Sequence, residues 1–174
     1  MELMVDKKDA LKKMIDGYYY PDTKKKELEA KLDTFDKSVI LPLEREITAL
    51  GEIQVKMENI LTYEREEDRM LELDAIESLI KDNITDVSRG SLAQMVVKYK
   101  NGGCDNPDLR KEFVPYFALI KETLVSKQDL ITTRLKECPD RNAYYAWKTA
   151  STVKTGAVVA GGVYLAIRIL KKFL

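Results

Sequence analysis

Apolar side chains recur at helical spacing along most of the chain, and this periodicity restricts the fold more than any other feature. The clearest example lies between residues 42 and 63, where the apolar residues fall close to a heptad: Leu43, Ile47, Leu50, Met57 and Leu61. Only 8 Gly and 5 Pro interrupt the sequence, which leaves room for long helices. Short β-branched runs separated by regular turn signals, the mark of strands, are absent from the sequence. We therefore predict an all-α fold, an irregular bundle of about five helices followed by a C-terminal hydrophobic helix.

Helix boundaries are predicted from prolines and capping residues. Pro21 ends a first helix, Pro42 begins a third helix at its favoured first turn, and Asp140 or Asn142 caps the last one. The charged stretch at 64–69 contains no helix breaker, so this stretch alone would allow one long helix that packs against two partners. Because the apolar stripe changes face across it, we favour a break there.

The apolar stripes also predict the core. A shorter helix over 88–99 carries four apolar residues, Leu92, Met95, Val96 and Val97. Five residues in the middle of longer stripes are expected to be buried: Leu32, Leu50, Ile80, Ile120 and Leu124. We assign residues 1–140 to the bundle body and residues 141–174 to a membrane-associated helix.

Charge is distributed unevenly along the chain. The net charge is zero, from 29 basic and 29 acidic residues, but from Lys148 onward there are five basic residues and no acidic one. An acidic body with a basic, apolar tail is not typical of nucleic-acid binding, in which basic surface dominates the domain. The same tail suits contact with anionic lipid headgroups.

The tail has the composition of a membrane segment. Residues 155–167 (TGAVVAGGVYLAI) carry no charge, and flanking basic side chains can extend towards headgroups. We favour a helix that spans the bilayer, while a helix lying in the interface or packed on another subunit stays open. The residues expected to contact lipid are Trp147, Lys154, Val158, Val159, Val163, Tyr164, Leu165, Ile167, Arg168, Ile169 and Leu170.

This tail resembles the C-terminal anchors of mitochondrial outer-membrane tail-anchored proteins, which are short, rich in Gly, Ala and Val, and flanked by basic residues. The resemblance covers about twenty residues and is one of composition. It implies insertion after synthesis, with the body on the cytosolic side. The body lacks the tetratricopeptide pattern of the fission adaptors that carry such tails.

Sequence motifs for catalysis, metals or nucleotides are not found. The chain has no histidine, which removes the commonest general base and zinc ligand. The run at 101–104 fits neither a Walker loop nor a dinucleotide fingerprint. Cys104 and Cys138 flank one predicted helix and are expected to be free thiols in a reducing compartment, and the N-terminal residues do not form a signal peptide. We expect no enzyme activity, cofactor or metal.

These features favour a non-enzymatic, C-terminally membrane-anchored helical scaffold or adaptor. Its helical body would bind one or more proteins, as in a small subunit of a large membrane-associated assembly such as an organellar complex or a virion shell. The expected location is an organelle membrane or a viral inner membrane. The alternative is a membrane-remodelling or pore-forming helical protein.

Overall fold

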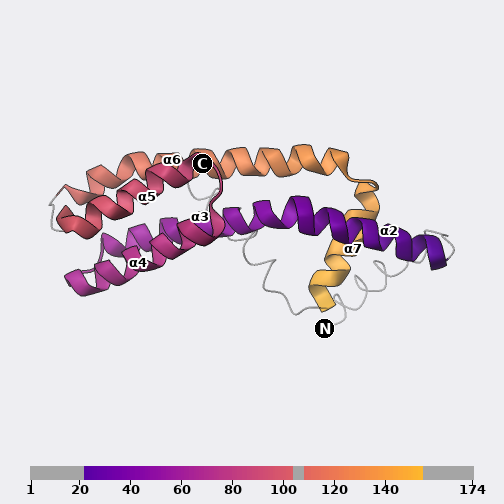
Figure 1. Cartoon of the computed structure of the whole chain (residues 1–174), viewed down its shortest axis with the longest axis horizontal. Helices are drawn as coiled ribbons and strands as arrows, with labels where there is room; N and C mark the ends of the chain where they lie inside the picture. The colour runs from indigo at the N-terminus through magenta and orange to yellow at the C-terminus, as the bar shows by residue number, and fades with distance from the viewer. Residues whose placement is uncertain (1–21, 104–107, 155–174) are drawn as a thin grey trace, which may run out of the picture. The chain divides into compact units, whose positions relative to one another are not determined.

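The computed structural model describes residues 22–103 and 108–154. The described residues contain helices and turns but no strand, which confirms the all-α prediction for this part of the chain (Figure 1). The α-helices are α2 (Asp22–Phe35), α3 (Leu41–Ile60), α4 (Glu66–Asn83), α5 (Ser88–Lys98), α6 (Leu109–Arg134) and α7 (Arg141–Lys154). The predicted first helix lies outside the described residues.

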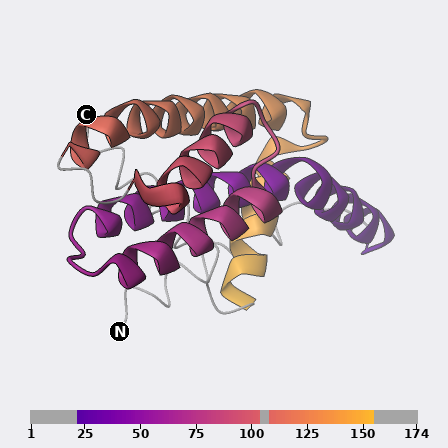
Figure 2. The ribbon, with the colours of Figure 1, turned by 60° about the vertical axis from the view of Figure 1, so that its left-hand side comes forward.

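The described helices form two compact units. The terminal unit comprises residues 22–42 and 131–154, and the central unit comprises residues 43–103 and 108–130. In the central unit α3, α4, α5 and the first part of α6 lie side by side in both views (Figure 1, Figure 2). The terminal unit contains α2 and α7, which pack against each other.

Each unit buries apolar stripes that the sequence predicts. The five residues expected in the core are all buried, none of them more than 3% exposed: Leu32, Leu50, Ile80, Ile120 and Leu124. The core of the central unit also contains Tyr99 and Phe113, whose rings meet edge to face at 5.0 Å between centroids. In the terminal unit Leu32, Ile40 and Tyr144 form the buried cluster. Val97 differs from its neighbours on α5, because it is 55% exposed and faces away from the core.

The prediction of a break after α3 is confirmed. α3 ends at Ile60 and α4 begins at Glu66, with a turn between them. The side chain of Arg69 donates a hydrogen bond to the backbone oxygen of Tyr63 at 2.8 Å, which holds the turn against the start of α4. Three acidic residues in the first turn of α4 complement the positive end of its dipole.

α3 begins at Leu41, so Pro42 lies in its first turn as predicted, but no break separates α3 from the preceding helix. The chain stays helical from Asp22 to Ile60 through a π-helical turn, Asp36–Ile40, that directly precedes α3. In regular α-helix the proline ring would clash with the carbonyl group four residues earlier. A wider turn before the proline is a local way to avoid that clash, so the helix continues.

Two further boundaries agree with the sequence. α7 is capped by Asp140, whose side chain accepts a hydrogen bond from the backbone N–H of Ala143 at 2.9 Å. After α5 the chain turns at Gly102, whose φ of 108° lies in the left-handed region that glycine adopts readily. The residues that follow, 104–107, lie outside the described residues.

Candidate functional site

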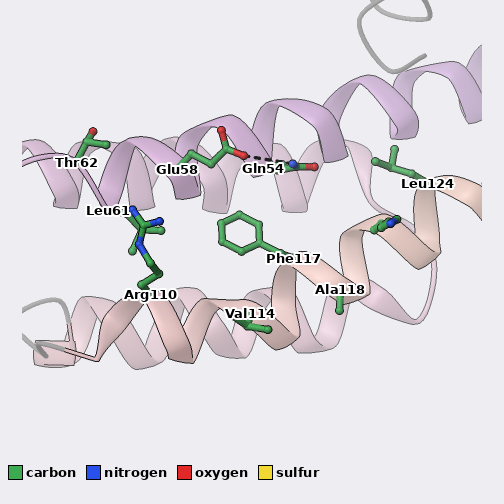
Figure 3. A pocket seen from close by; sticks show the side chains of 10 residues that line it. Gln54, Glu58, Leu61, Thr62, Arg110, Val114, Phe117, Ala118 and Leu124 are labelled. Carbon is green, nitrogen blue, oxygen red and sulfur yellow. Dashed lines mark hydrogen bonds between the residues drawn. The ribbon is translucent and has the colours of Figure 1, made fainter. Parts of the chain in front are cut away.

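An open groove of about 750 Å³ lies in the central unit between α3 and α6 (Figure 3). Its α3 wall consists of Gln54 and Glu58 of α3 with Leu61 and Thr62 of the turn that follows, and its α6 wall consists of Arg110, Val114, Phe117, Ala118, Lys121 and Leu124. Apart from the adjacent pairs Leu61–Thr62 and Phe117–Ala118, successive residues within each wall are three or four positions apart, so the α6 wall is one helix face and the α3 wall is the end of a helix face with the turn after it. We call this feature the α3/α6 groove.

The apolar part of the α3/α6 groove comes mainly from α6. Leu124 is buried, whereas Phe117 is half-buried and points into the space between the two helices (Figure 3). Val114 is 59% exposed. A single exposed apolar residue needs no explanation, but here the exposed Val114 lies beside the half-buried Leu61 and Phe117 in one groove.

The two walls carry opposite charges. On α3 the carboxylate of Glu58 is exposed and accepts a hydrogen bond from the Gln54 amide at 3.3 Å (Figure 3). On α6 the cationic side chains of Arg110 and Lys121 are exposed. The groove therefore combines an apolar floor with one acidic and one basic rim.

A carboxylate from α4 fixes the end of α3 that forms this wall. Glu72 accepts hydrogen bonds from Lys56 at 2.8 Å, Asn59 at 2.9 Å and Tyr63 at 3.4 Å. Burial disfavours the charged form of Glu72, but these bonds and the Lys56 ammonium outweigh it and lower the pKa of the carboxyl group. The last turns of α3 are thus tied to α4 on the side away from the groove.

A buried ion cluster joins α3, the α4–α5 turn and α6. The ammonium group of Lys127 pairs with Glu46 Oε2 and lies 3.0 Å from Asp86 Oδ2. The other oxygen of Glu46 accepts hydrogen bonds from the backbone N–H, at 2.9 Å, and the hydroxyl of Thr85. Asp86 in turn accepts hydrogen bonds from the backbone N–H and hydroxyl of Ser88, at 2.9 and 2.5 Å.

Charge pairing in this cluster outweighs desolvation. Burial lowers the pKa of Lys127, but the hydrogen bonds and charges of Glu46 and Asp86 raise it above its usual value overall. Burial raises the pKa of Asp86, but its bonds to Ser88 and Lys127 lower it overall. Both carboxylates bind Lys127, so the cluster suits a role in fixing helix register better than a reaction with solvent.

Sequence reasoning missed this cluster although a signal was present. Glu46 lies four residues before Leu50, and Lys127 lies three residues after Leu124, so both charges interrupt buried stripes. A charge at a core position of a helix implies a buried partner. Periodicity within one helix does not identify that partner.

One residue that the sequence predicts to contact lipid packs inside the terminal unit. Trp147 is partly buried against the cluster of Leu32, Ile40 and Tyr144. Asp36 accepts hydrogen bonds from the Tyr144 hydroxyl at 2.6 Å and the Lys148 ammonium at 2.7 Å, which join α7 to the π turn. Contact of Trp147 with lipid stays a prediction.

Of the other predicted membrane contacts, only Lys154 lies within the described residues. Lys154 is the last residue of α7, and Val158, Val159, Val163, Tyr164, Leu165, Ile167, Arg168, Ile169 and Leu170 lie outside the described residues. Among residues 22–103 and 108–154, no helix combines the length and apolar character that a membrane crossing requires.

Metal-binding and reactive groups do not gather in the described part of the chain. There, His, Cys, Asp and Glu side chains form no group of three or more that could hold a metal ion. Cys138 is a partly buried free thiol that lies 3.6 Å from the backbone oxygen of Asp140, and burial raises its pKa. A thiol of this kind is a poor nucleophile at neutral pH.

Comparison of the chain with protein-family models, with curated proteins and with solved structures finds no match. The α3/α6 groove is therefore interpreted from its own geometry and chemistry.

Proposed function

We propose that this chain is a non-enzymatic helical adaptor that binds another protein in the α3/α6 groove and is held at a membrane by its C-terminal segment. The observation that carries the proposal is the groove itself, in which the half-buried Phe117 points between the two helices and the exposed Val114 lies on the α6 wall. Grooves of this form accept one apolar face of a partner helix. The buried charges of the described core, Glu46 and Lys127, pair with each other, which suits a structural role in a binding module.

Membrane attachment is the second part of the proposal and rests on the sequence of the tail. Residues 155–167 are uncharged and are followed by a basic segment without acidic residues. A body on the cytosolic side of an organelle membrane or a viral inner membrane would present the groove to soluble or membrane-bound partners. Such a chain could serve as a small subunit of a larger membrane-associated assembly.

Site-specific photo-crosslinking tests the groove. A photo-reactive phenylalanine at the position of Val114 should yield one discrete protein adduct from the full chain in its native membranes. The matched control is the position of Val97 on α5, which is nearly as exposed, 55% against 59%, but does not line the groove. Equal adduct patterns from both positions would contradict the proposal.

Membrane extraction tests the tail. The full chain should stay in the pellet after alkaline carbonate, and a chain lacking residues 150–174 should be released. Leu165→Asp should weaken insertion by about 2.5–3.5 kcal/mol if the segment spans the bilayer. Release of the full chain by carbonate, combined with loss of binding on deletion, would contradict spanning and indicate an interfacial or protein-bound helix.

The remodelling alternative predicts a different result. A pore-forming or remodelling protein should release dye from sealed anionic vesicles, whereas an anchored adaptor should bind them without release. Dye release that needs residues 155–174 would favour the alternative.

A further inference from the structure

We propose that the occupant of the α3/α6 groove is an amphipathic α-helix of another protein, with acidic side chains along the edge that faces α6. This inference rests on the proposed function and specifies its partner. It is carried by the spacing of the wall residues and by the charges on the two walls.

The shape of the groove fits a helix. The lining residues of α6 run from Arg110 to Leu124, which at 1.5 Å per residue is about 21 Å. Those of the α3 wall run from Gln54 to Thr62 in the turn after α3, about 12 Å. A partner helix would therefore contact both walls over roughly two turns. Apolar residues at positions i, i+4 and i+7 of the partner would meet Leu61, Val114 and Phe117.

The charges on the two walls determine which charged side chains the partner should carry and in which direction it should lie. Arg110 and Lys121 place two cations along the α6 wall, and Glu58 places an anion on the α3 wall. A helix with acidic residues beside its apolar stripe gains attraction to the α6 wall, and a basic edge in the same position is repelled. Because the two walls differ in sign, the partner also has a preferred direction along the groove.

The test uses three designed 21-residue helical peptides with the same apolar stripe. The first has Glu beside the stripe and Lys on the far face. The second exchanges these two sets, so composition and net charge are identical. The third has Gln beside the stripe. Binding to the full chain in nonionic detergent is measured by fluorescence anisotropy at fixed salt.

The first peptide should bind roughly 3- to 10-fold more tightly than the second, because it can form two exposed ion pairs with the α6 wall and each pair contributes a small attraction. The double variant Arg110→Glu/Lys121→Glu should reverse this order. Both positions are exposed, and an acidic residue in the first turn of α6 suits the helix dipole, so the variant should fold. Equal binding of the first two peptides by both proteins would overturn the inference.

A second pair of variants separates this inference from the proposed function. Val114→Asp should weaken the binding of all three peptides by at least about 10-fold, because it places an unpaired charge against an apolar surface. Val97→Asp should leave their binding unchanged. Loss with Val114→Asp but no preference among the peptides would overturn the acidic-edge inference alone. No binding, or equal effects of the two aspartates, would overturn helix docking in the groove. Self-association that only Val114→Asp abolishes would assign the groove to a second copy and also overturn the inference.

Discussion

Removal of the buried ammonium group by Lys127→Met should destabilise the central unit strongly. Lys127 is 9% exposed and Glu46 is 5% exposed, so the substitution leaves the Glu46 carboxylate buried with only the donors of Thr85. Asp86 loses its 3.0 Å contact with the ammonium as well. Breaking one side of a buried ion pair costs about 3–5 kcal/mol, of which methionine packing recovers a part through the retained aliphatic stem.

Urea unfolding of the full chain, followed by circular dichroism in nonionic detergent, measures this loss as a lower midpoint at constant slope. The partner variant Glu46→Gln and the double variant complete a cycle. We expect the double variant to lose less than the sum of the single losses, with a coupling of about 1–3 kcal/mol. A loss below about 1 kcal/mol for Lys127→Met, or additive single losses, would refute the idea that this pair holds α3 against α6.

Three further predictions concern stability. Leu50→Ala, at a fully buried site, should lower the unfolding free energy by about 2–5 kcal/mol, and a loss well below this in the same urea titration would mean that the stripe does not pack as described. Asp36→Ala removes the acceptor of Tyr144 and should speed trypsin cleavage within α7, whereas unchanged cleavage would deny Asp36 a role in holding that helix. Stability should also depend on pH at both extremes. The pKa of Asp86 is lowered in the folded state, so its contribution is present above about pH 4 and lost as the pH falls. The pKa of Lys127 is raised, so its contribution is present below about pH 10.4 and lost as the pH rises, and urea midpoints across pH should show a steeper alkaline decline than in Lys127→Met.

Local periodicity predicted the helices and their buried faces well, because each apolar stripe is a property of one segment. The break between α3 and α4 was also predictable, since the stripe changes face there. The π turn before Pro42 was not, because a proline can either begin a helix or be accommodated within one, and the surrounding packing decides between the two. On α5, apolar character alone does not separate the buried Leu92, Met95 and Val96 from Val97, which faces solvent.

The candidate site was less accessible to sequence reasoning than the fold. The α3/α6 groove depends on how two helices lie against each other, and residues such as Glu58 and Arg110 are 52 positions apart in the chain. Glu46 and Lys127 are likewise far apart in the sequence. A stripe reveals that a charge occupies a core position, but only the packed structure shows what it contacts.

The central claim is that the body binds its partner through the α3/α6 groove. Hydroxyl-radical footprinting of the full chain, alone and in its native membrane-bound assembly, tests this claim most directly. Oxidation of Phe117 and Leu61 should fall in the assembly, while oxidation of Leu71, which is 67% exposed on α4, should stay unchanged. Protection of Leu71 with unchanged oxidation of Phe117 and Leu61 would contradict the account.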